Sequence, residues 1–135
     1  MTVVVSYVPT QEGRSALRAA ADEALRRRTP LVLVQPDRAS GSVDEQEARA
    51  LETVRASAVS DLDAAGLSHE VRYVTVSNDP AGDLLSIAET VGAELIVIGL
   101  RRRTPVGKLV LGLSAQRILL DAPCAVLAVK APRPL

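Results

Sequence analysis

Short β-branched runs alternate with longer stretches of helical periodicity along the chain, and this alternation limits the fold class more than any other feature. The five runs, each bounded by turn or helix signals, are expected to be strands. They cover residues 3–7, 31–34, 70–76, 95–98 and 125–129. Strands that alternate with helices predict a parallel sheet with helices on both faces, because such crossovers are right-handed. We therefore expect one doubly wound α/β domain over residues 1–135, a three-layer α/β/α sandwich with four helices.

The helical stretches carry their own boundary signals. Ser42 and Glu45 have the spacing of a capping box at the start of the second stretch, and Gly66 is placed to end it. Asp79 and Pro80 combine an N-cap with proline at the first helical position of the third stretch. The four helices are expected within residues 10–28, 42–66, 79–92 and 109–120.

The composition argues against several classes of protein. Two tyrosines are the only aromatic residues, so the core must consist of Val, Leu, Ile and Ala, which suits a buried parallel sheet. Sixteen basic and sixteen acidic side chains cancel, which predicts no general attraction to nucleic acid or to anionic membranes. One cysteine and one histidine cannot form an internal disulfide or a cysteine or histidine metal cluster. Because the N-terminus has neither a basic leader nor a long apolar segment, we expect a cytoplasmic protein without a membrane span.

A loop containing glycine and arginine follows the fourth predicted strand, with Gly99 at its start and Gly112 thirteen residues later. Glycines let a phosphate approach the backbone, and the free N–H groups of a helix N-terminus favour anions. Three consecutive arginines, Arg101, Arg102 and Arg103, add positive charge. The residues alone leave two interpretations open: an anion cradle, or a solvated basic loop whose glycines only form turns.

In a doubly wound sheet the ligand cleft lies at the carboxyl ends of the strands, where the strand order reverses. Ser6 and Tyr7, which end the first strand, and Ser114, near the start of the fourth helix, are candidates for its walls. Tyr7 is expected to be a core or cleft-wall residue rather than a base. The only histidine, His69, opens the third strand outside this cleft, so a Ser/His/Asp arrangement cannot form there. We therefore expect no enzyme activity.

The segment VIGLRRRTPVGKLVLGLSAQRILLDAPCAVLAVK, residues 97–130, resembles the C-terminal block of the universal stress protein family. The first strand, the alanine-rich first helix and the Asp79-Pro80-Ala81 helix start also match the layout of that family. The resemblance implies a Rossmann-like sheet of order 3-2-1-4-5, as in the adenine nucleotide alpha hydrolases. It also implies a role in stress responses.

Nucleotide-binding members of the family carry Gly, two residues, Gly, nine residues, and Gly followed by Ser or Thr. Gly99 and Gly112 match this pattern, whereas four positions associated with nucleotide binding depart from it: Val8, Pro36, Arg102 and Leu113. Val8 stands where the family has an acidic residue for the ribose. Pro36 lacks the backbone N–H that could donate a hydrogen bond to the edge of an adenine. Each lost hydrogen bond costs about 0.5–1.5 kcal/mol, so ATP binding of the usual kind is not expected.

Two functions follow from the resemblance. The first is a stress-response regulatory or interaction protein that does not bind ATP in the usual way. The alternative is a module for an adenine nucleotide (ATP, ADP, AMP or cAMP), with Arg101, Arg102 and Arg103 gripping phosphate through guanidinium forks. The fifth strand should lie at a sheet edge, and its family counterpart pairs with its own copy. A homodimer is therefore expected through Ala125, Val126, Leu127, Ala128 and Val129.

Overall fold

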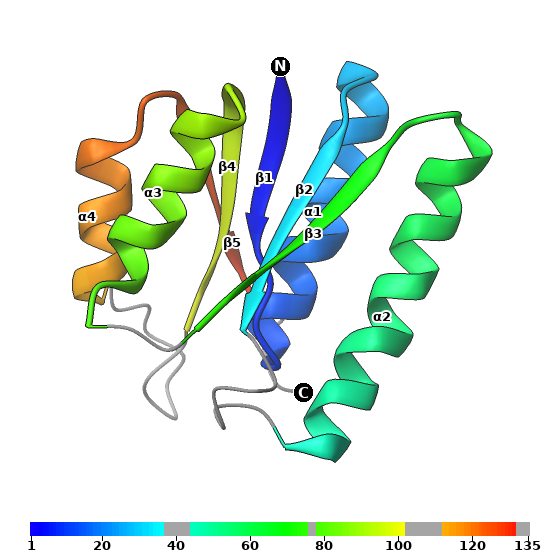
Figure 1. Cartoon of the computed structure of the whole chain (residues 1–135), viewed down its shortest axis with the longest axis horizontal. Coiled ribbons are helices and arrows are strands. Elements are labelled where there is room, and N and C mark those ends of the chain that lie inside the picture. The colour runs from blue at the N-terminus through cyan, green and yellow to red at the C-terminus, as the bar shows by residue number, and fades with distance from the viewer. Residues whose placement is uncertain (37–43, 76–77, 102–111, 132–135) are drawn as a thin grey trace.

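The computed structural model describes residues 1–36, 44–75, 78–101 and 112–131, and these contain one five-stranded sheet (Figure 1). Its strand order is β3-β2-β1-β4-β5, and all neighbouring strands are parallel. The predicted order and doubly wound topology are therefore confirmed. The strands are β1 (Thr2–Ser6), β2 (Leu31–Pro36), β3 (His69–Val74), β4 (Ala93–Leu100) and β5 (Ala125–Lys130).

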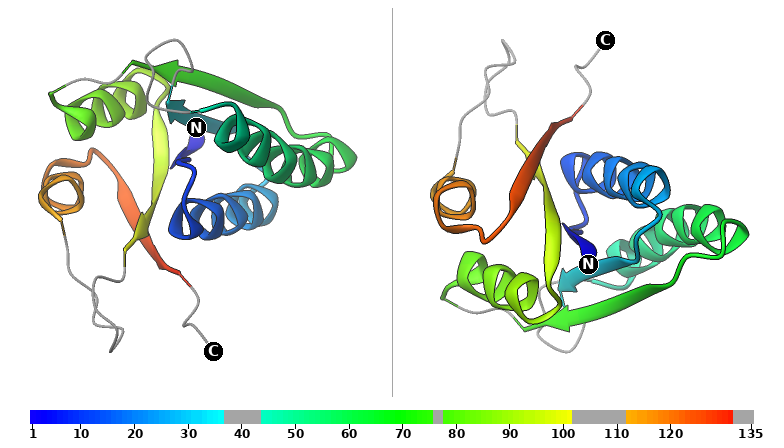
Figure 2. Two further views of the ribbon diagram at one scale, coloured as in Figure 1. Left: turned by 90° about the horizontal axis from the view of Figure 1, so that it is seen from below. Right: turned by 90° about the horizontal axis from the view of Figure 1, so that it is seen from above.

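Helices cover both faces of this sheet, as the alternation of elements predicts. Seen along the sheet in Figure 2, α1 and α2 lie on one side and α3 and α4 on the other. In the described part of the chain, no helix is long and apolar enough to cross a membrane. The helices are α1 (Gln11–Arg27), α2 (Glu45–Ala64), α3 (Pro80–Thr90) and α4 (Leu113–Asp121).

The start of α2 differs from the sequence prediction. Ser42 lies outside the described residues, and Asp44 is the N-cap: its carboxylate accepts a hydrogen bond from the backbone N–H of Glu47 at 2.7 Å. The predicted capping box of Ser42 and Glu45 is therefore wrong. A carboxylate caps the helix as well as a serine does, and it adds a favourable charge at the positive end of the helix dipole.

Two further boundaries differ from the prediction. Thr75, expected in the third strand, lies beyond its end at Val74. The fourth helix was expected from residue 109, but Gly112 has extended backbone (φ −67°, ψ 167°) and caps a helix that begins at Leu113. In contrast, Gly66 does follow the end of α2 in a left-handed conformation (φ 73°), which a glycine adopts without steric cost.

The core consists of two apolar layers, one on each face of the sheet. Val3 and Val5 of β1 face the layer under α1 and α2, whereas Val4 faces the layer under α3 and α4. The helix α1 packs closely on the sheet because its inner face carries small residues, and these are fully buried: Ala16, Ala20, Ala21 and Ala24. This packing fixes the carboxyl ends of the strands, where the candidate site lies.

Candidate functional site

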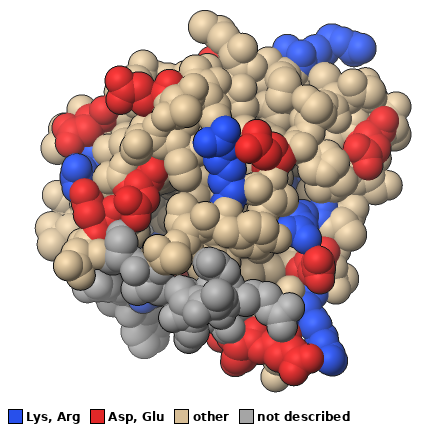
Figure 3. Space-filling model, viewed as in Figure 1, with Lys and Arg blue, Asp and Glu red and all other residues tan. Residues whose placement is uncertain are grey.

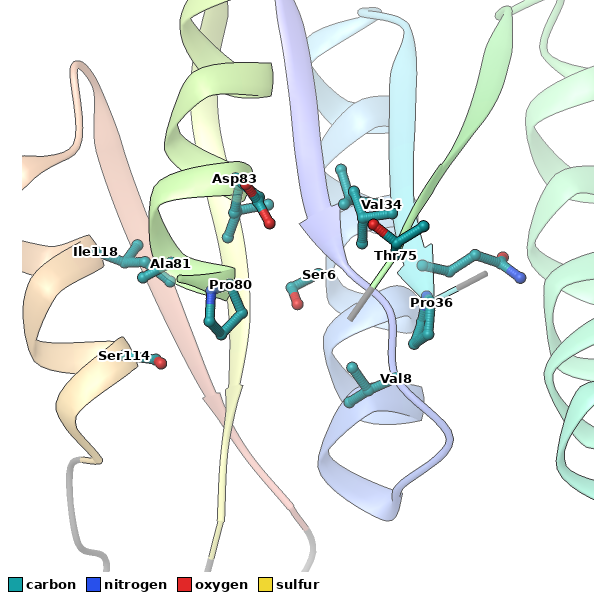
Figure 4. Close-up of a pocket in the computed structure, with 13 residues that line it drawn as sticks. Ser6, Val8, Val34, Pro36, Thr75, Pro80, Ala81, Asp83, Ser114 and Ile118 are labelled. Atoms are coloured by element: carbon teal, nitrogen blue, oxygen red, sulfur yellow. The ribbon is translucent and has the colours of Figure 1, made fainter. Parts of the chain in front are cut away.

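An apolar cavity of about 280 Å³ opens at the carboxyl ends of β1, β2 and β3, against α3 and α4 (Figure 4). We call it the base cavity. In Figure 4, Pro80, Ala81 and Ser114 lie on one side, Val34 and Thr75 lie on the other, and Ser6 lies between them. Its volume is close to the lower limit of about 300 Å³ for small-molecule sites. The lining residues are Ser6, Val8, Val34, Gln35, Pro36, Val74, Thr75, Pro80, Ala81, Asp83, Leu84, Ser114 and Ile118.

A second cavity of about 260 Å³ lies beside the N-terminus of α4. We call it the phosphate cavity because it has the features predicted for an anion cradle: glycines, an arginine and a helix N-terminus. Gly112 caps α4 without any side-chain hydrogen bond, so the first N–H groups of this helix have no side-chain cap. The lining residues are Glu12, Gly99, Leu100, Arg101, Gly112, Ser114 and Ala115.

Ser114 is the residue that the two cavities share. It lies in the first turn of α4, next to Leu113, which occupies the family's hydroxyl position in sequence. Leu113 is 85% exposed and lines neither cavity, whereas the adjacent Ser114 lines both. Among the described residues, Ser114 is thus common to the lining of an apolar cavity and of a more polar one.

Three further predicted site residues also reach these cavities. Ser6, Val8 and Pro36 line the base cavity. Tyr7 does not, because successive side chains of a strand point to opposite faces of the sheet. Its ring is fully buried on the α1 and α2 side, and its hydroxyl donates a hydrogen bond to the carbonyl of Leu51 at 2.7 Å.

Tyr7 is therefore a core residue, as the sequence allowed. Burial raises the pKa of its phenol to about 12. Such a group stays protonated at physiological pH and cannot act as a base.

Close packing against α1 requires a glycine at position 99. A Cβ placed on it would collide with the backbone carbonyl of Glu12 in the first turn of α1. In contrast, no described atom lies within 4 Å of a Cβ placed on Gly112. The first glycine of the pattern is thus required for the packing of β4 against α1, whatever it does for a ligand.

Among the described residues that line the phosphate cavity, Glu12 and Arg101 are charged and form an ion pair. Arg101 Nε lies 3.7 Å from Glu12 Oε1, and the exposed fractions of the two side chains are 69% and 16%. Arg102 and Arg103, which the sequence also predicts at this site, lie outside the described residues. Sequence reasoning missed Glu12, because nothing in the sequence places the start of α1 beside the end of β4.

The amino-acid sequence as a whole matches the universal stress protein family model over residues 1–130. The chain belongs to the universal stress protein family. It is 41% identical over 128 residues to a universal stress protein of Mycolicibacterium smegmatis, with 95% of this chain and 96% of that one covered.

Solved structures of the family share the fold. A universal stress protein from Archaeoglobus fulgidus has a TM-score of 0.71 and 30% identity, covering 96% of this chain and 98% of its own. A universal stress protein from the same organism, solved in complex with dAMP, has a TM-score of 0.67 and 26% identity, with the same coverage. The resemblance seen in the sequence is therefore confirmed for family and fold.

The start of α3 contributes more to this universal stress protein's site than the sequence reasoning foresaw. Thr75, Pro80, Ala81 and Asp83 all line the base cavity. The strand order 3-2-1-4-5 would have indicated them, because it brings the end of β3 and the following helix to the same edge as β1.

An ion pair holds α3 and α4 together beside the base cavity. Asp79, the N-cap of α3, accepts a hydrogen bond from the guanidinium of Arg117 on α4. On the face shown in Figure 3, basic and acidic side chains lie interspersed, which accords with such pairing. Among the described residues, no cluster of His, Cys, Asp and Glu could hold a metal ion.

Proposed function

We propose that this universal stress protein is a regulatory binding protein whose cleft takes an adenine nucleoside or mononucleotide, and that it does not bind ATP in the family's usual way. The observation that carries the proposal is the pair of cavities that both have Ser114 in their lining. The base cavity is apolar, whereas the phosphate cavity has glycines, a guanidinium and a helix N-terminus without a side-chain cap. These two environments are complementary to the base and the phosphate of a nucleotide.

The base cavity suits an aromatic base. Aliphatic and proline side chains from three strands and two helices form its walls, so a flat apolar ring would lose water on both sides. Thr75 and Asp83 would supply the polar contacts, with the Asp83 carboxylate accepting hydrogen bonds from ligand hydroxyl or amino groups. This carboxylate lies in the same cavity as Val8, where the family's usual acidic group is missing.

The comparison with solved structures supports the ligand class. The universal stress protein from Archaeoglobus fulgidus that was solved with dAMP has the same fold and matches nearly the full length of this chain. We expect a monophosphate to be preferred over a triphosphate, because the phosphate cavity contains the Glu12 carboxylate.

We propose no catalytic role for the chain. Its one histidine, His69, begins β3 at the amino end of the sheet, opposite the two cavities. The Glu12 carboxylate in the phosphate cavity is paired with Arg101, which disfavours its use as a general base.

Ser114→Leu is expected to weaken the binding of adenosine and AMP at least tenfold, because the added isobutyl group enters the junction of the two cavities. Tenfold corresponds to about 1.4 kcal/mol. Isothermal titration calorimetry with adenosine, AMP, dAMP, cAMP and ATP measures the affinities. The matched control is Ser86→Leu, the same substitution at an exposed position of α3 outside both cavities. The proposal fails if no adenine compound binds the unaltered protein, or if ATP binds it more tightly than AMP.

We also propose a homodimer through β5, the strand that ends the sheet beside β4. One edge of β5 is paired with β4 from Ala125 to Lys130, and the other edge has no strand neighbour in the described sheet. An apolar edge strand of this length readily pairs with a second copy. Multi-angle light scattering is expected to give twice the 14.2 kDa chain mass at micromolar concentration. A monomer mass up to millimolar concentration would refute the dimer.

A further inference from the structure

The phosphate cavity contains a built-in negative charge, contributed by the Glu12 carboxylate. We propose that Glu12 determines how many phosphates this cavity accepts: by holding Arg101 and placing its own charge in the cavity, it selects against polyphosphates. The inference rests on the proposed function and specifies its ligand class. A nucleoside or a mononucleotide is accepted, and a di- or triphosphate is disfavoured.

The position of Glu12 is fixed by the fold. It is the second residue of α1, and its backbone lies directly against Gly99 of β4, where not even a Cβ would fit between the two elements. Its side chain is 16% exposed, so the carboxylate is largely enclosed by the cavity wall. The packing of α1 on β4 therefore fixes the backbone of Glu12 at the cavity wall.

The charge balance of the cavity follows from this position. Among the described lining residues, Glu12 and Arg101 are the only ionisable ones, and their charges cancel. Among the described residues, the α4 N-terminus adds a partial positive charge that favours an anion, since Gly112 provides no side-chain cap. Each further phosphate would bring a like charge beside the carboxylate and would compete with it for the arginine.

Arg101 is the group that a change at Glu12 would release. Its side chain is 69% exposed and pairs with the Glu12 carboxylate, so the guanidinium can turn toward a phosphate once the carboxylate is gone. A role of Glu12 in helix stability alone, as an acidic residue in the first turn of α1, predicts a different result. It predicts a lower melting temperature and unchanged anion affinity.

Glu12→Gln tests the inference because it keeps the size of the side chain and removes its charge. We measure tripolyphosphate, adenosine and ATP binding by calorimetry in magnesium-free buffer, with thermal melting as the check of folding. The affinity for tripolyphosphate is expected to rise about tenfold, and the ratio of ATP to adenosine affinity by a similar factor, because like charges a few ångströms apart at a protein surface repel by at least that amount. Adenosine affinity itself is expected to stay within twofold.

Two further variants separate the cavity from the overall charge. Glu89→Gln makes the same change in net charge at an exposed position in the last turn of α3, away from both cavities, and is expected to leave tripolyphosphate affinity unchanged. The double variant Glu12→Gln, Arg101→Met is expected to lose the gain that Glu12→Gln produces, because the released guanidinium is missing.

The outcomes distinguish this inference from the proposed function. If tripolyphosphate affinity is unchanged in Glu12→Gln, or rises equally in Glu89→Gln, the role of Glu12 is refuted, even where adenosine and AMP bind as proposed. If adenosine and AMP bind no variant while tripolyphosphate binding rises in Glu12→Gln alone, the proposed nucleoside function is refuted and the charge selection by Glu12 stands.

Discussion

Gly99→Ala is expected to lower the free energy of unfolding by about 2–3 kcal/mol, near the upper end of the range for overpacked sites. The new methyl group would collide with the carbonyl oxygen, carbonyl carbon and Cβ of Glu12. These are mainly backbone atoms of a helix that packs on the sheet, so they cannot move aside as the end of a flexible side chain could. Either β4 or the start of α1 must shift, which weakens the core on that face.

Gly112→Ala is the matched control for this prediction. No described atom lies within 4 Å of the added methyl group, and the backbone of Gly112 is in a conformation open to any residue. Only the poorer N-cap propensity of alanine remains, with an expected cost below about 1 kcal/mol. Urea denaturation followed by circular dichroism measures both variants. Equal losses at the two positions would contradict the packing role of Gly99.

Because Gly99 is tightly packed and, among the described residues, Gly112 is not, binding data on substitutions at these two glycines have to be interpreted differently. A loss of ligand affinity in Gly99→Ala would not by itself show a phosphate contact, because the fold around Glu12 would already be altered. Gly112, which lines the same cavity without tight packing among the described residues, is the cleaner position for testing backbone contact with an anion.

Raising the pH from 10 to 12 is expected to lower the free energy of unfolding by about 2 kcal/mol through Tyr7 alone. Burial raises the pKa of the Tyr7 phenol from 10.0 to about 12 in the folded protein. Below pH 10 the phenol is protonated in both the folded and the unfolded chain, and it contributes no pH dependence. Between pH 10 and 12 the unfolded chain releases the proton and the folded chain retains it, so stability falls as the pH rises.

Tyr7→Phe isolates this contribution. The variant is expected to lose about 1 kcal/mol at pH 7, because the carbonyl of Leu51 loses the hydrogen bond from the hydroxyl. It is also expected to lose the Tyr7 part of the decline between pH 10 and 12. The matched control is Tyr73→Phe, since Tyr73 is 53% exposed and its phenol has no comparable burial. Urea midpoints measured across this pH range give the slopes, and identical slopes for the wild-type protein and Tyr7→Phe would contradict the assignment.

The sequence alone was sufficient for the architecture because the signals for it are local. Period-two and helical patterns, glycine stops and the Asp79-Pro80 start each depend on residues a few positions apart. Such patterns indicated all five strands and four helices, and the resemblance to the family supplied their order. Where local signals compete, the prediction was wrong, as at Asp44, which caps α2 in place of the expected Ser42–Glu45 box.

The tertiary structure decided which residues form the site. Glu12 and Arg101 are 89 positions apart in the sequence, and they meet because α1 packs on the end of β4. The choice of Ser114 over Leu113 depends on the rotation of α4 about its axis, which no spacing in the sequence reveals. Local periodicity determines what the elements are, whereas the side chains that share a cavity depend on how elements distant in sequence pack. For this reason the sequence led to the family and the fold, and only the packed structure placed a carboxylate where the family resemblance had suggested a phosphate.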